Sequence, residues 1–90
     1  MNQNIPKRFC KDKIYYSKYV EDGTLTAVYK YYTNQLGDWE ILQHYDRFRS
    51  AEVVTTYPRA SDLYGTIMIG EVFISEEEYE NILFMEELKK

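Results

Sequence analysis

The Asp22-Gly23 pair is the feature that most constrains this chain, because it separates two stretches with the character of β-strands. Residues 13–20 and 24–33 are rich in tyrosine and β-branched residues, which favour strands. Asp-Gly between two such stretches is the strongest short-range signal of a β-hairpin, since glycine readily adopts the positive φ that the turn requires. In the second strand we expect the face with Leu25, Ala27, Tyr29 and Tyr31 to be the core face, at its Leu25 end.

Three more strands are predicted after this hairpin. Residues 39–48 and 52–57 have β-type composition, and residues 66–74 form the most hydrophobic stretch, with apolar residues on both faces. We therefore expect the 66–74 strand to lie at the centre of the sheet, with Gly70 allowing a bend. Residues 61–65, which run from a serine to a glycine, are expected to form one helical turn.

A helix is predicted for the C-terminal residues. Ser75 fits the N-cap position, and Glu78 follows three residues later, as in a capping box. Acidic residues follow the cap, and Lys89 and Lys90 lie at the other end, which is the charge order that the helix dipole favours. The predicted fold class is α+β: about five antiparallel strands that form a curled sheet or a partly closed small barrel, with one C-terminal helix packed on it.

At 90 residues the chain is predicted to contain one domain. Residues 1–12 are basic and disfavour regular structure, so we expect an N-terminal arm followed by a single α+β domain over residues 13–90. Either Ile5 or Phe9 is expected to fasten the arm to the domain. The longest apolar stretch is too short to cross a bilayer, and the first residues contain no signal-peptide core. We therefore expect a cytoplasmic protein without a membrane partner.

The residue types give no sign of a catalytic or metal site. Cys10 is the only cysteine and His44 the only histidine; they lie in different predicted segments, and neither has a motif around it. The glycine-rich motifs that bind phosphates do not occur. Glu71 is isolated in the most apolar stretch, where we expect an edge-facing or arginine-paired carboxylate. These observations predict a protein that is not an enzyme, with no catalytic residue, no metal and no cofactor.

Tyrosine is unusually frequent, with ten in the chain. Six of them lie in the first hairpin and are divided between its two predicted faces, so some of these rings are expected to be exposed. Tyrosine and arginine are enriched in the hot spots of protein interfaces. We therefore predict a small binding module that acts through protein–protein contacts, as an inhibitor or adaptor, for example an immunity protein or a phage anti-defence protein. The candidate binding residues are Tyr16, Lys18, Tyr19, Tyr29, Lys30, Tyr31, Tyr32, Tyr57, Arg59, Asp62 and Tyr64.

The distribution of charge indicates a second candidate surface. Residues 1–50 carry eight Lys or Arg against six Asp or Glu, whereas residues 51–90 carry three against nine. Such an acidic helix face is either simply solvated or docks on a basic partner. The candidate residues of this acidic face are Glu76, Glu77, Glu80, Glu86 and Glu87.

The sequence also allows two alternative functions, nucleic-acid binding and small-ligand binding, and the formation of a homodimer. Lysines are interleaved with the hairpin tyrosines, and Arg47 and Arg49 follow, an arrangement typical of single-stranded nucleic-acid binders. An exposed edge strand would allow a homodimer. A small-ligand-binding domain would need a pocket lined by some of Arg59, Asp62, Tyr64 and His44.

Overall fold

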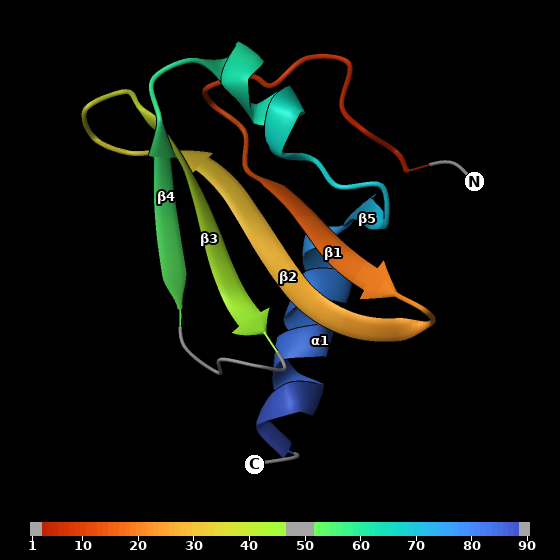
Figure 1. Ribbon diagram of the computed structural model, residues 1–90. Helices are drawn as coiled ribbons and strands as arrows, with labels where there is room; N and C mark the ends of the chain where they lie inside the picture. Colours follow the sequence, from red (N-terminus) through yellow and green to blue (C-terminus); the bar gives the residue numbers. More distant parts are fainter. Residues whose placement is uncertain (1–2, 47–51, 89–90) are drawn as a thin grey trace.

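The computed structural model describes residues 3–46 and 52–88, with the backbone alone for residues 45, 46 and 86–88. Within these ranges the chain forms one five-stranded antiparallel sheet, a short 3-10 helix and one α-helix (Figure 1). The strand order is β4-β3-β2-β1-β5, and the sheet stays open rather than closing into a barrel. The α+β prediction is confirmed. The elements are β1 (Tyr15–Glu21), β2 (Thr24–Thr33), β3 (Trp39–Asp46), β4 (Val53–Tyr57), η1 (Ala60–Thr66, the 3-10 helix), β5 (Glu71–Ile74) and α1 (Glu76–Leu88).

The predicted hairpin is present and follows from its turn. Asp22 and Gly23 both have positive φ, at 51° and 77°, as a two-residue turn between antiparallel strands requires. β1 and β2 pair along the whole length of β1, and the other edge of β2 pairs with β3. The hairpin therefore lies in the interior of the sheet, and both of its faces meet other parts of the chain.

The two faces of the sheet are covered by different segments (Figure 1). The N-terminal arm and η1 cover one face, which we call the arm face, and α1 crosses the other, which we call the helix face. Of the two residues expected to fasten the arm, Phe9 is 5% exposed and Ile5 is 40% exposed, so Phe9 is the anchor. On the helix face, the ring centroids of Tyr79 and Tyr16 are 4.6 Å apart. The core on the arm face is built from Phe9, Tyr31, Trp39, Ile41, Leu63 and Phe73.

Two expectations about the core are wrong in part. Of the β2 residues expected on the core face, Ala27 and Tyr31 are buried, but Leu25 is only half-buried, because the arm and η1 cover the Tyr31 end of the sheet. Residues 66–70 do not form a strand, and β5 lies at the edge of the sheet beside β1 instead of at its centre. The apolar residues of this stretch have different surroundings: Ile69 is 97% exposed in a turn, while Phe73 enters the core.

Contacts on both sides hold β5 in its edge position. Towards β1, the Val20 N–H donates to the Gly70 carbonyl at 3.2 Å, and a Cβ on Gly70 would lie 2.5 Å from the Val20 carbonyl oxygen. Glycine is required for so close an approach of two backbones. On the outer side, the Phe73 N–H donates to the Gln3 carbonyl at 2.9 Å, and Gln3 Nε2 donates to two carbonyls of the 68–71 segment. The arm thus takes the place of a neighbouring strand.

The helix α1 begins where the sequence predicts it. The Ser75 hydroxyl accepts a hydrogen bond from the Glu78 N–H at 3.1 Å, which confirms the N-cap. The Glu78 carboxylate in turn accepts a hydrogen bond from Lys18 at 2.7 Å, which ties the first turn of α1 to β1. Among the described residues, no helix has the length and apolar character that a membrane span needs.

Candidate functional site

The candidate tyrosines of the hairpin lie on both faces of the sheet. Tyr31 is buried in the core, and Tyr29 packs against it on the arm face. Tyr19 lies on the same face and is half-buried. Tyr16 and Tyr32 lie on the helix face, also half-buried, and each donates its hydroxyl hydrogen to a carboxylate. The hairpin therefore does not present an open platform of exposed rings.

The two candidate lysines of the hairpin contact partners within the protein. Lys18 Nζ lies 2.7 Å from Glu78 Oε2, and Lys30 Nζ lies 5.6 Å from the centroid of the Tyr32 ring, within cation–π range. The Tyr32 hydroxyl donates to Glu40 Oε1 at 2.7 Å. This hydrogen bond and burial raise the pKa of Tyr32 to about 12. The cationic and aromatic groups of this face are thus largely satisfied internally.

The candidate residues between β4 and β5 lie around η1. Arg59 Nη2 is 3.5 Å from Asp62 Oδ1 at the start of η1. The Tyr64 hydroxyl donates to the Pro6 carbonyl at 3.1 Å and so fastens η1 to the arm. Tyr57 is half-buried against the core. The structure brings Arg59 and Asp62 together as a surface ion pair, while Tyr64 has a structural role at the arm.

Cys10 and His44 lie on opposite faces of the sheet. The Cys10 N–H donates to Tyr15 Oη at 2.8 Å on the arm face. His44 Nδ1 lies 3.3 Å from Glu52 Oε1, and its ring lies beside that of Tyr79 on α1. In the part of the chain that the structure describes, no three His, Cys, Asp or Glu side chains gather closely enough to hold a metal ion.

The predicted acidic face is partly described. Glu76, Glu77 and Glu80 are exposed on the first turns of α1. The Tyr16 hydroxyl donates to Glu76 Oε2 at 3.2 Å, and burial together with this carboxylate raises the pKa of Tyr16 above its ordinary value. The side chains of Glu86 and Glu87 lie outside the described residues. Three carboxylates of the predicted face therefore project from the start of the helix.

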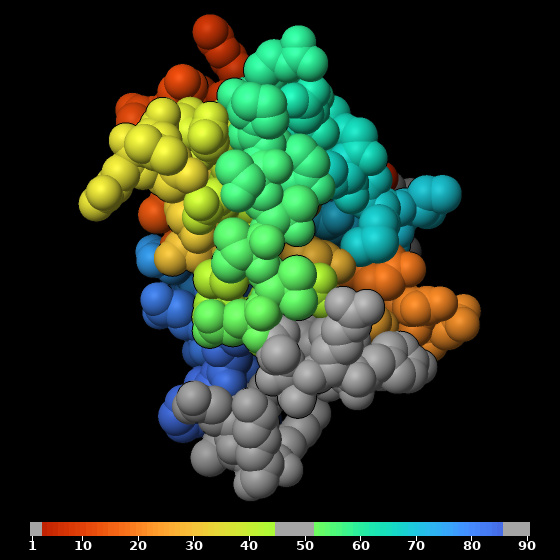
Figure 2. Space-filling view, turned by 60° about the vertical axis from the view of Figure 1, so that its left-hand side comes forward, coloured from red at the N-terminus to blue at the C-terminus, as the bar shows by residue number. Residues whose placement is uncertain are grey.

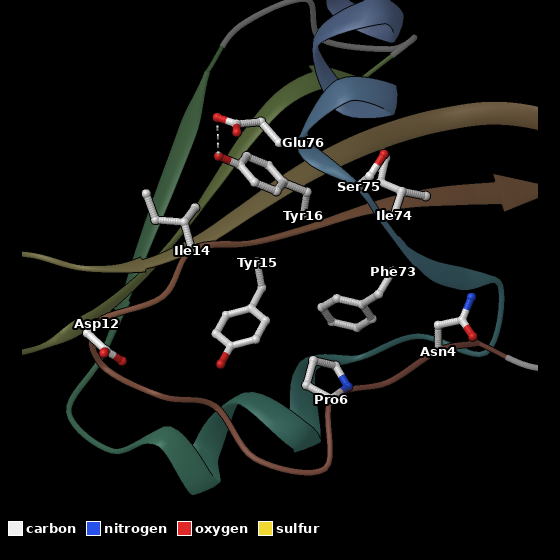
Figure 3. Close-up of a pocket in the computed structure, with 10 residues that line it drawn as sticks. All are labelled: Asn4, Pro6, Asp12, Ile14, Tyr15, Tyr16, Phe73, Ile74, Ser75 and Glu76. Carbon is white, nitrogen blue, oxygen red and sulfur yellow. Dashed lines mark hydrogen bonds between the residues drawn. The ribbon is translucent and has the colours of Figure 1, made fainter.

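A groove of about 650 Å³ lies beside the N-terminal end of β1 (Figure 3). We call it the Tyr15 groove. Figure 3 shows the rings of Tyr15 and Phe73 in its middle, Asp12 at one end and Asn4 at the other, with Glu76 on the side of α1. The groove is lined by Asn4, Pro6, Asp12, Ile14, Tyr15, Tyr16, Phe73, Ile74, Ser75 and Glu76.

The groove exists because β5 ends early. Its last pair with β1 is Tyr16 opposite Ile74, since Ser75 caps α1 and turns the chain away from the sheet. Among the described residues, Tyr15 therefore has a strand partner only on its β2 side. The Tyr15 hydroxyl accepts a hydrogen bond from the Cys10 N–H and donates to the Arg8 carbonyl at 3.3 Å, which fixes the arm as the opposite wall.

The charges that line the Tyr15 groove are negative. Asp12 and Glu76 are exposed carboxylates at its rim, and among the described residues no lysine or arginine belongs to its lining. Ile14 at the rim is half exposed, and Tyr15 and Phe73 provide an aromatic floor. The groove thus combines an apolar floor with an anionic rim, which is suited to binding a basic group with apolar neighbours.

Two of the residues predicted for binding, Tyr16 and Glu76, line the Tyr15 groove. The others that line it were not predicted, because the groove depends on where the arm crosses β1 and where β5 stops. The apolar Ile14 just before β1 is the signal in the sequence that points to it. Comparisons of the chain with known protein families, with curated protein sequences and with solved structures each found no match.

Proposed function

We propose that this protein is a non-catalytic binding module that holds a basic, extended segment of a partner protein in the Tyr15 groove. The observation that carries the proposal is the lining of the groove: aromatic and aliphatic side chains form the floor, and the charged residues among its described lining are Asp12 and Glu76. Lysine or arginine side chains with apolar neighbours complement such a surface. The net charge of −4 also attracts a basic partner from a distance.

The free edge of β1 supports an extended conformation of the partner. β5 stops pairing at Ile74, opposite Tyr16. A partner strand beside Ile14 and Tyr15 would continue the line of β5 and could pair with the backbone around the start of β1, which is the recognition mode known as β-strand addition. The Lys13 N–H takes no part, since it donates to the Cys10 carbonyl at 3.0 Å. Alternate side chains of that strand would then face the Tyr15 and Phe73 rings, and the others would face the solvent and the rim carboxylates.

A module of this kind acts by occupying a basic segment. If that segment belongs to an active site or to a nucleic-acid-binding surface, the module is an inhibitor; if it does not, the module is an adaptor. Immunity proteins and phage anti-defence proteins are two classes of such inhibitors. The exposed Glu77 and Glu80 add negative charge beside the groove. The proposed setting is the cytoplasm, where a single free cysteine such as Cys10 is ordinary.

The nucleic-acid alternative has less support than the protein-binding proposal. It requires exposed rings and free cations on the first hairpin. Lys18 forms an ion pair with α1, Lys30 lies over the Tyr32 ring, and the hairpin tyrosines are buried or half-buried. Arg47 and Arg49, which belong to the same hypothesis, lie outside the described residues.

Two synthetic hexapeptides test the proposal, one of alternating arginine and valine and one of alternating glutamate and valine. With isotope-labelled protein, the basic peptide should shift the amide signals of residues 13–16 and 73–76, and the acidic peptide should leave them unchanged. Shifts confined to other regions, or equal shifts from both peptides, would contradict the proposal. An oligothymidylate that shifts the hairpin signals instead would favour the nucleic-acid alternative.

A matched pair of double variants separates the groove from net charge. Asp12→Asn with Glu76→Gln removes both rim charges and should weaken binding of the basic peptide about twofold to thirtyfold, at about 0.2–1 kcal/mol per exposed ion pair. The control, Glu21→Gln with Asp22→Asn, removes the same charge at the tip of the hairpin and should have little effect. Equal losses in the two variants would show that only net charge matters.

A further inference from the structure

Glu71, at the start of β5, is a buried carboxylate with neutral partners. It is 1% exposed. Ser17 Oγ donates to Glu71 Oε2 at 2.6 Å, the Tyr31 hydroxyl donates to the same oxygen, and the Met68 N–H donates to Oε1 at 3.2 Å. Among the described residues, no Lys, Arg or His side chain forms an ion pair with it. The expectation of an edge-facing carboxylate is therefore wrong, and none of the arginines that the structure describes pairs with Glu71.

The three groups that donate hydrogen bonds to Glu71 are neutral: two hydroxyls and a backbone N–H. Burial and the negative charge of Glu71 raise the pKa of Tyr31 well above its ordinary value, so its hydroxyl remains protonated. A carboxylate can accept about four hydrogen bonds, and Ser17, Tyr31 and Met68 each donate one to Glu71. Burying a charged group without an opposite charge is costly, and a bound cation would offset that cost.

Glu71 is one of the residues that line a cavity of about 170 Å³ on the arm face. We call it the Glu71 cavity. It lies between β2, β3 and β4 on one side and the segment after η1 on the other; Figure 2 shows β4 (green) and that segment (cyan) side by side. The rings of Tyr29, Tyr31 and Tyr57 also line it. Sites for drug-sized ligands are usually about 300–1,000 Å³, so this cavity suits a single small group.

We propose that the Glu71 cavity binds a small organic cation, an alkylammonium or guanidinium group, with the Glu71 carboxylate as its counter-charge. A carboxylate beside aromatic rings is the combination that recognises such cations, through a charge-assisted hydrogen bond and cation–π attraction. The cation would supply the opposite charge and a further N–H donor to the carboxylate. The group comes either from a free amine or guanidine or from a basic side chain of a partner protein. This site is separate from the Tyr15 groove and does not depend on the proposed function.

The probes are n-butylammonium, methylguanidinium and the neutral n-butanol, each titrated into isotope-labelled protein. The two cations should shift the amide signals of residues 53–57 and 66–71, whereas n-butanol at the same concentrations should not. Glu71→Gln, which keeps the shape of the side chain, should weaken cation binding at least tenfold. Equal responses to n-butylammonium and n-butanol, or unchanged binding by Glu71→Gln, would overturn the proposal.

A second pair of variants leaves Glu71 intact, in case its replacement disturbs the fold. Thr55 is exposed on β4 and lines the Glu71 cavity, and its neighbour Thr56 is also exposed but points to the helix face. Thr55→Phe should abolish cation binding by filling the cavity, and Thr56→Phe should leave it unchanged. Equal binding by the two variants would place the cation elsewhere and refute the site.

The source of the cation is distinguished by one further titration. N-acetyl-arginine amide carries the guanidinium group on a capped backbone, as in a protein. If it shifts the same signals as methylguanidinium, the cavity accepts an arginine side chain of a partner. If methylguanidinium binds and the capped arginine does not, the cavity is a site for a free small cation. Both results support the cavity as a cation site, and neither involves signals of residues 13–16, which report on the Tyr15 groove.

Discussion

Replacing Phe9 with alanine should remove a large part of the free energy of unfolding, because this residue joins the arm to the core. Its ring is buried, with its centroid 4.9 Å from that of Tyr15 and 5.6 Å from that of Tyr31. Truncating a buried phenylalanine costs about 3–5 kcal/mol. A domain of this length has a total stability of roughly 5–14 kcal/mol, from about 0.05–0.15 kcal/mol per residue. If the free energy of unfolding of the wild type lies at the lower end of this range, the variant should therefore be close to unfolding at room temperature.

Urea denaturation followed by the fluorescence of Trp39 measures this loss. Trp39 is fully buried, and its ring centroid lies 5.7 Å from that of Phe9, so its emission reports on the same part of the core. Ile5→Ala is the control in the same arm. Because Ile5 is 40% exposed and lies outside the core cluster, this variant should lose clearly less free energy of unfolding than Phe9→Ala. A Phe9→Ala loss below about 1 kcal/mol would refute the inclusion of the arm in the core.

Two further predictions concern Gly70 and Tyr32. Gly70→Ala should destabilise the protein by about 1–3 kcal/mol, because the new Cβ would lie 2.5 Å from a backbone oxygen of β1. The control is Gly65→Ala, which should change stability by less than about 1 kcal/mol, because a Cβ there would meet nothing within 4 Å. Urea unfolding of the two variants measures the difference. The hydrogen bond to Glu40 and burial raise the pKa of Tyr32 to about 12 from an ordinary value of 10.0, so the folded state holds this proton more tightly. The stability that this group contributes is complete below pH 10 and is lost as the pH rises towards 12. The free energy of unfolding should therefore fall less steeply over this range in Tyr32→Phe than in the wild type, and parallel curves would contradict the assignment.

The parts of the fold that the sequence predicts are those governed by local interactions. The turn at Asp22 and Gly23 requires positive φ at neighbouring positions, and the residue pair itself shows this. The N-cap at Ser75 is a contact over three positions, and the spacing to Glu78 shows it as well. In both cases the interacting groups are close in the chain, so residue type and spacing are enough.

The position of β5 and the burial of Glu71 depend on distant residues. The apolar pattern of residues 66–74 resembles that of a central strand, yet the neighbour on its outer side is Gln3 of the arm. Glu71 accepts hydrogen bonds from Ser17 and Tyr31, which are 54 and 40 positions away in the chain. A pattern read along one segment cannot show such partners, and for the same reason it could not show the Tyr15 groove or the Glu71 cavity.

The contacts between Gln3 and β5 have a consequence for the rate of folding. The side chain of Gln3 bonds to carbonyls 65 and 68 positions away. Such contacts form only after most of the chain has been brought together, and β-rich proteins dominated by them fold in milliseconds to seconds. The β1–β2 hairpin closes through a two-residue turn and can form in about 1–10 μs. We therefore expect an early hairpin and a late closure by β5 and the arm, and until that closure the outer edge of β1 is bare and open to pairing with other chains.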